Sequence, residues 1–90
     1  MHIGAVVRTR SGRDRYRLYV ITGVTEDGRV LIADGRLHKL ERPKKKNLRH
    51  LTVLAAGSEK IDPLRMTDGE LAAYLQDFEK TIKIMKTPLC

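Results

Sequence analysis

The sequence predicts a mainly β domain, a small five-stranded barrel, followed by one amphipathic helix. Short runs rich in β-branched residues and separated by turn residues fill positions 3–54, which is typical of small β domains. After residue 66 the apolar residues recur instead with the period of a helix. A chain of 90 residues buries only a thin core, and closing the strands into a barrel removes their exposed edges.

The first three strands are expected at residues 3–9, 16–24 and 29–33. The first alternates between two faces, the second is rich in aromatic and β-branched residues, and the third is apolar on both faces. Between the first two lies "RSGRD", where Gly12 permits a positive φ angle and Asp14 can bond its own backbone. This segment is therefore expected to form a turn.

The fourth and fifth strands are expected at residues 36–40 and 48–54. Asp34 and Gly35 predict a two-residue type I′ turn into the fourth strand, because both positions of that turn need a positive φ angle. Pro43 is expected to end the pairing, since proline has no backbone N–H. The number of strands fits an SH3-like barrel and an OB-fold equally well.

A helix is expected over residues 67–86, because Thr67 and Glu70 match a capping box. Its apolar stripe consists of Leu71, Leu75, Phe78, Ile82 and Met85. We favour a stripe that packs on the barrel and enlarges its core; the alternative is a surface for a protein partner or a homodimer, since the spacing is heptad-like. The expected parts are the barrel at 1–55, a connector at 56–66, the helix at 67–86 and a tail at 87–90.

Positive charge is concentrated in the first half of the chain, although the net charge of the whole is +7. Residues 1–50 carry thirteen Lys and Arg against five Asp and Glu, whereas residues 51–90 carry five against six. An uneven field of this kind attracts polyanions, of which nucleic acid is the commonest in cells. The composition therefore favours a nucleic-acid-binding protein.

Several classes of protein are disfavoured. No stretch reaches the ~18 to 20 apolar residues that span a bilayer, the first residues do not resemble a secretion signal, and one cysteine builds no disulfide framework. These features predict a cytoplasmic protein without membrane contact. His2, His38 and His50 lack metal-ligand spacing, and no catalytic or nucleotide-binding motif is present. The expectation is a protein without enzymatic activity, metal, cofactor or small-molecule substrate.

Two groups of cations are expected to form an RNA-binding face at one end of the barrel. They are Arg10, Arg13, Arg15 and Arg17 in the first group, and Lys39, Arg42, Lys44, Lys45, Lys46 and Arg49 in the second. Arginine suits bidentate phosphate contacts and lysine acts as a point charge. Tyr16 and Tyr19 are the only aromatic residues nearby, and at least one is expected in the core. Recognition of RNA shape and backbone is therefore expected, with few base contacts.

The stretch "VVRTRSGRDRYRLYVITGV" resembles a KOW motif, the strand-turn-strand segment of several ribosomal proteins and transcription elongation factors. The wider segment, with "SGRD", "LIADG", "KLERPKKK" and "LRHL", resembles small bacterial KOW-domain RNA-binding proteins, which are similar in turn to a large-subunit ribosomal protein of archaea and eukaryotes. The resemblance implies an SH3-like barrel that binds RNA, with ribosomal RNA as the expected target.

The resemblance also implies that Gly12, Arg13, Asp14, Arg15 and the lysines of "PKKK" lie at the binding end. Tyr16 departs from the motif, which usually has glycine at this position. The alternative function is a protein-interaction module that binds a ribosomal or transcription protein, in which the positive charge only steers the approach.

Overall fold

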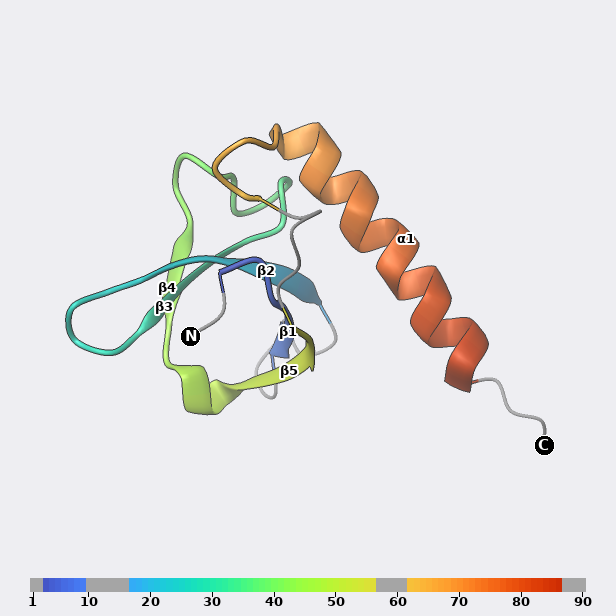
Figure 1. Cartoon of the computed structure of the whole chain (residues 1–90), viewed down its shortest axis with the longest axis horizontal. Coiled ribbons are helices and arrows are strands. Elements are labelled where there is room, and N and C mark those ends of the chain that lie inside the picture. The colour runs from blue at the N-terminus through green and yellow to red at the C-terminus, as the bar shows by residue number, and fades with distance from the viewer. Residues whose placement is uncertain (1–2, 10–16, 57–61, 87–90) are drawn as a thin grey trace.

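The structure, a computed structural model, describes residues 3–9, 17–56 and 62–86, with side chains described up to residue 81. It contains a five-stranded antiparallel sheet and a long C-terminal helix (Figure 1). The elements are β1 at Val6–Thr9, β2 at Leu18–Val24, β3 at Val30–Ala33, β4 at Lys44–Lys46, a 3-10 turn at Leu48–His50, β5 at Leu51–Ala55 and α1 at Asp68–Lys86. The predicted class, mainly β with a C-terminal helix, is confirmed.

The sheet is open. Its strand order is β4-β3-β2-β1-β5, so that β4 and β5 form opposite edges and do not pair with each other. The predicted closure into a barrel is therefore not observed in the described residues. The short strand β4 uses its three residues to pair with β3, and the chain then turns before β5 pairs with β1.

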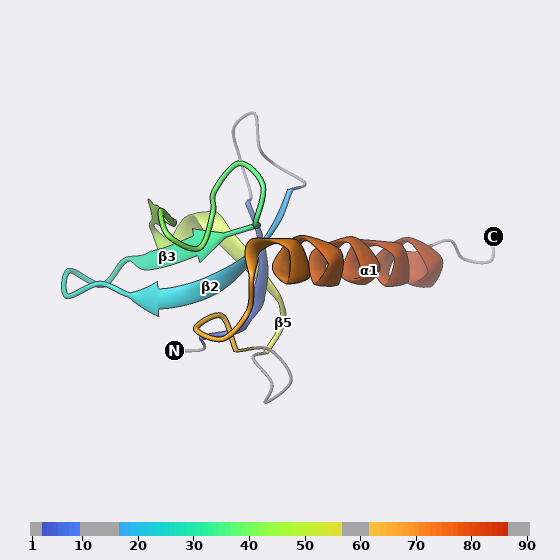
Figure 2. The ribbon, with the colours of Figure 1, turned by 90° about the horizontal axis from the view of Figure 1, so that it is seen from above.

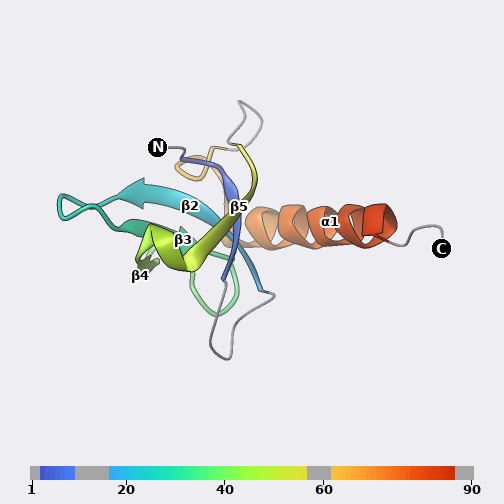
Figure 3. The same cartoon turned by 90° about the horizontal axis from the view of Figure 1, so that it is seen from below.

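The open sheet is nevertheless strongly curled. Five strands side by side in a flat sheet would separate the two edges by about 19 Å. The chain crosses from β4 to β5 through Asn47 and the turn Leu48–His50 alone, a connection that spans only about 13 Å. Irregular pairing in β1 and in β2 adds local twist, as β-bulges do. Figure 3 shows β4, the turn and β5 following one another around the curled edge.

Two apolar clusters lie on opposite faces of the sheet. The inner cluster is enclosed by the curl and consists of Ala5, Val7, Tyr19, Ile21, Val30, Ile32 and Leu51. The outer cluster lies under the helix and consists of Val6, Val20, Ala33, Leu71 and Leu75. Neighbouring residues of a strand point to opposite faces, so Val6 and Val7 are both fully buried, one in each cluster. The buried Tyr19 confirms the expected core tyrosine.

The predicted position of the fourth strand, residues 36–40, is wrong. Residues 36–40 form no strand, and the fourth strand is the lysine run of β4. The carboxylate of Asp34 accepts the backbone N–H groups of Arg36 at 2.9 Å and His38 at 3.0 Å, which closes a compact loop after β3. A long loop, residues 34–43, therefore replaces the predicted two-residue turn, and Pro43 lies before the strand. The first three residues of the fifth segment form the turn Leu48–His50 instead of a strand.

The helix was predicted correctly. Glu70 accepts the backbone N–H of Thr67 at 2.9 Å, and Thr67 accepts that of Glu70 at 3.1 Å, which completes the capping box. Leu71 and Leu75 are buried in the outer cluster and Phe78 packs against it, so the first half of the stripe serves the protein's own core. The side chains of Ile82 and Met85 lie outside the described residues. Figures 1 and 2 show the second half of α1 extending beyond the sheet.

The helix α1 does not have the character of a membrane span. Within the described residues, no helix combines the length and the apolar content needed to cross a bilayer.

Candidate nucleic-acid interface

The segment 36–49 carries seven Lys and Arg and one acidic residue, Glu41. It runs through the loop 34–43, along the edge strand β4 and into the turn Leu48–His50, and its course can be followed in green in Figure 1. We call this segment the basic edge. Its cations are Arg36, Lys39, Arg42, Lys44, Lys45, Lys46 and Arg49.

The three lysines of β4 do not share a face. Lys44 and Lys46 pair with Ile32 and Val30, two members of the inner cluster. Paired residues of adjacent strands lie on the same face, so Lys44 and Lys46 lie on the inner face and Lys45 on the opposite one. Lys44 and Lys46 are half-buried and Lys45 is exposed, which fits lysine stems that cover apolar surface while their ammonium groups reach water.

The position of these three lysines on an edge strand also has a structural consequence. In the part of the chain that the structure describes, β4 pairs with β3 alone. Charged residues on an edge strand, lysine above all, hinder pairing with the edge of another molecule. The lysine run therefore protects the sheet against edge-to-edge association, whatever else it binds.

Arg17 is engaged within the protein. Its Nη1 atom lies 4.0 Å from Oδ2 of Asp34, and its side chain is 49% exposed. This ion pair connects the start of β2 to the loop that follows β3. Arg10, Arg13 and Arg15 lie outside the described residues.

The two described residues that flank segment 10–16, Thr9 and Arg17, lie close to two parts of the basic edge. Thr9, the last residue of β1, pairs with Leu51, which directly follows the turn that carries Arg49. At the other end, Arg17 contacts the loop 34–43 through Asp34. Arg17 is the one member of the first cation group that the structure describes, so the expected proximity of the two groups stays a prediction. The lysines of β4, in contrast, run along the sheet edge and are not gathered at one end.

One acidic side chain lies close to the basic edge. Asp27, at the tip of the β2–β3 hairpin, accepts a hydrogen bond from the hydroxyl of Thr25 and lies 3.7 Å from Arg29. The hydrogen bond from Thr25 is the main cause that lowers the pKa of Asp27, and the positive charge of Lys45 lowers it further. Asp27 is therefore a carboxylate at neutral pH, and its charge opposes that of Lys45.

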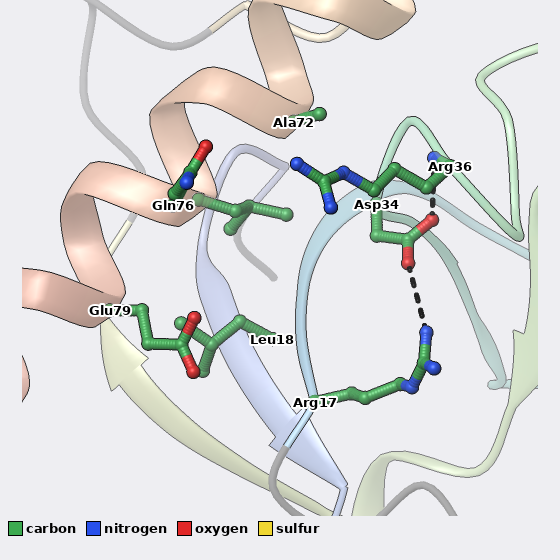
Figure 4. Close-up of a pocket in the computed structure, with 8 residues that line it drawn as sticks. Arg17, Leu18, Asp34, Arg36, Ala72, Gln76 and Glu79 are labelled. Atoms are coloured by element: carbon green, nitrogen blue, oxygen red, sulfur yellow. Dashed lines mark hydrogen bonds and ion pairs between the residues drawn. The ribbon is translucent and has the colours of Figure 1, made fainter.

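A pocket of about 230 Å³ lies between α1, the start of β2 and the loop 34–43 (Figure 4). Sequence reasoning missed three of its polar residues, Arg36, Gln76 and Glu79. Arg36 was assigned to a predicted strand, although it directly follows the turn residues Asp34 and Gly35. Gln76 and Glu79 carry no motif, so only their position on α1 beside the loop reveals them.

The loop 34–43 is fixed to the first turn of α1. The backbone N–H of Leu40 donates to the carboxylate of Asp68 at 2.7 Å, and Gly35 packs against the backbone of Asp68 and Ala72. These contacts hold one wall of the pocket against the other.

No group of three or more His, Cys, Asp or Glu side chains that could hold a metal ion occurs within residues 3–9, 17–56 and 62–81. The ring centroids of His38 and Tyr19 lie 5.8 Å apart, and the planes of the two rings make an angle of 43°. The position of His38 is that of a side chain packed over the edge of the inner core.

Neither models of known protein families nor curated proteins match this chain. The resemblance to KOW-domain proteins therefore rests on the motifs quoted above.

Proposed function

We propose that this protein is a non-enzymatic, cytoplasmic RNA-binding module of the KOW type that contacts the phosphate backbone of structured RNA. The observation that carries the proposal is the basic edge, where seven cations and a single acid follow one another through the loop 34–43, the edge strand β4 and the turn Leu48–His50. A linear array of cations suits a linear array of phosphates, and such contacts supply most of the affinity of nucleic-acid-binding proteins. Ribosomal RNA is the expected target.

Two features of the fold support an SH3-like interpretation. The strand order β4-β3-β2-β1-β5 is that of a meander whose last strand returns beside the first. The sheet also curls far enough to enclose the inner cluster on the face away from the helix. A small curled sheet is the framework expected of a KOW domain from the sequence motifs.

The salt dependence of RNA binding tests the proposal. With about five phosphate contacts, the logarithm of the association constant should fall with the logarithm of salt concentration with a slope of roughly −3.5 to −4.5. Fluorescence anisotropy with a labelled ribosomal RNA hairpin, measured between low and physiological salt, gives this slope. A slope near zero, or absence of binding at low salt, contradicts the proposal.

Substitution of Lys44, Lys45 and Lys46 together by glutamine localises the contacts. The expected result is weaker binding to every RNA tested and a slope flatter by at least about 0.7, the contribution of one lost phosphate contact. The matched control replaces Lys80, Lys83 and Lys86 of α1 by glutamine, which removes the same charge elsewhere. An equal loss of RNA affinity in both triple variants would show that net charge alone, and not the basic edge, determines binding.

A further inference from the structure

The pocket between α1 and the sheet has an apolar floor and polar walls. Leu18, Ala72 and Leu75 supply the apolar surface, and Arg36, Gln76 and Glu79 are exposed at its margin. In Figure 4, Gln76 and Glu79 project from α1 on one side, whereas Arg36 lies on the other with the ion pair of Arg17 and Asp34. A carboxylate and a guanidinium group thus border the same space from opposite sides.

These polar side chains are not engaged with one another. Among the side chains that the structure describes, those of Arg36, Gln76 and Glu79 make no hydrogen bond or ion pair. The charges around the pocket also balance, since Arg17 and Arg36 face Asp34 and Glu79. A balanced pocket is a poor site for a phosphate or another simple anion. It suits a neutral ligand with donors on one edge and acceptors on another.

The volume points to a small ligand. At about 230 Å³ the pocket is smaller than the ~300 to 1,000 Å³ typical of sites for drug-sized molecules. A single flat ring system fits this size, and one of its faces would lie on the apolar floor. Nucleobases that leave the stack are commonly held by apolar side chains against the ring and by hydrogen bonds to their edges.

The hydrogen-bonding groups select among the bases. Guanine offers two neighbouring donors, N1–H and N2–H₂, which match the two oxygens of a carboxylate such as Glu79. It also offers two neighbouring acceptors, O6 and N7, which match the paired donors of arginine. Adenine, in contrast, presents a donor beside an acceptor on each edge and cannot pair both oxygens of a carboxylate.

We propose that this pocket binds one unpaired guanine of the bound RNA, an inference that rests on the proposed function and identifies a base-selective site beside the basic edge. Glu79 accepts the hydrogen bonds of N1–H and N2–H₂, Arg36 donates to O6 and N7, and the base lies against Leu18 and Leu75. The helix α1 then becomes part of the RNA-binding surface, in addition to its role in the core.

Mononucleotides test the pocket independently of RNA binding. We expect 5′-GMP to shift the backbone amide signals of Leu18, Ala72 and Gln76 in NMR spectra of the full chain. Its affinity should exceed that of 5′-AMP about five- to tenfold, the low end for a bidentate pair because the margin of the pocket is exposed. Inosine monophosphate, which lacks the 2-amino group, should fall between the two. The mononucleotides carry the same sugar and phosphate, so only the base explains a difference in affinity.

Two substitutions locate the selectivity. Glu79→Gln should reduce the preference for 5′-GMP over 5′-AMP to less than about twofold. Arg36→Gln should weaken the binding of 5′-GMP more than the binding of 5′-AMP. Asp77→Asn is the matched control for Glu79→Gln, since Asp77 is exposed on the same helix and does not line the pocket. Arg65→Gln serves the same purpose for Arg36, because Arg65 is exposed and pairs with Asp62 instead. All four residues are exposed, so circular dichroism should show unchanged folding.

The outcomes separate this inference from the proposed function. Salt-dependent RNA binding without any preference for 5′-GMP overturns the guanine pocket and leaves the RNA-binding function standing. Selective binding of 5′-GMP without RNA binding supports the guanine selectivity of the pocket, but overturns both the RNA-binding function and the assignment of that guanine to RNA. If neither is observed, both are wrong. A preference for 5′-GMP that survives Glu79→Gln also overturns the assignment of the pocket.

Discussion

Gly35 lies so close to the first turn of α1 that a Cβ atom on it would overlap the carbonyl oxygen of Asp68. The φ angle of Gly35 is 80°, a value that residues with side chains rarely adopt. The carboxylate of the same Asp68 accepts the backbone N–H of Leu40 at 2.7 Å. The loop 34–43 and the start of the helix therefore form one structural unit, and a side chain at position 35 would separate them.

Gly35→Ala should be much more destabilising than Gly28→Ala. Both glycines have a positive φ angle, for which alanine costs about 1–2 kcal/mol. A Cβ at Gly28 meets no atom within 4 Å, whereas one at Gly35 meets the helix backbone and adds about 1–3 kcal/mol of overpacking. Urea unfolding of the two variants isolates the contact with the helix. Equal losses of unfolding free energy would show that the loop does not press on α1.

Leu71→Ala should lower the free energy of unfolding by about 2–5 kcal/mol, as for other buried leucines. Leu71 lies in the outer cluster against Val6 and Val20. Leu64→Ala is the control, since Leu64 is 84% exposed and should change stability by less than about 0.5 kcal/mol.

Leu75→Glu tests self-association: burying a charge there should unfold or detach the helix. A stably folded variant that sediments as a monomer, beside a dimeric parent, would contradict the core assignment.

The two faces of β4 should contribute unequally to RNA binding. A rigid RNA helix laid on one face of an edge strand meets Lys45 or the pair Lys44 and Lys46, but not all three side chains equally. We therefore expect Lys45→Gln to change the salt slope by about 0.7–0.9. Substitution of Lys44 and Lys46 together by glutamine should change it little, since these two lysines lie on the other face of the strand. Equal effects per lysine would indicate that the RNA wraps around the edge.

Asp27→Asn should increase RNA affinity. The carboxylate is kept charged because the hydrogen bond from Thr25, and then the charge of Lys45, lower its pKa. Removal of this negative charge beside the basic edge should raise affinity about two- to fivefold at low salt and less at high salt. Glu26→Gln is the control, because Glu26 is exposed at the same hairpin tip. An equal increase in both variants would indicate an effect of net charge alone.

Patterns confined to a few neighbouring residues predicted much of the fold. The β-branched runs located β1, β2 and β3, and the capping pair Thr67 and Glu70 located the start of α1, because strand and helix periods and end contacts are local properties. Val6 is apolar although its neighbours Ala5 and Val7 already supply the apolar face of residues 3–9, and this departure from strict alternation has a tertiary explanation. The strand is covered on one face by the inner cluster and on the other by the helix, so neither Val6 nor Val7 faces water.

Local reasoning failed where distant or competing contacts prevailed. The segment 36–40 looked like a strand, but the carboxylate of Asp34 binds the N–H groups that a strand would use. Three consecutive lysines have low β propensity, yet they pair with β3 because the chain after Pro43 lies beside it. Nothing in their own composition predicts that pairing.

The amino-acid order alone was enough to locate the cations and to indicate that polyanions would be attracted, since charge depends on composition. It could not assign those cations to faces. The face of the sheet on which each lysine of β4 lies follows from the register between β3 and β4. The pocket follows from the packing of α1 beside the loop 34–43. Both depend on contacts between residues far apart in the chain, which arise only when the sheet curls and the helix packs against it.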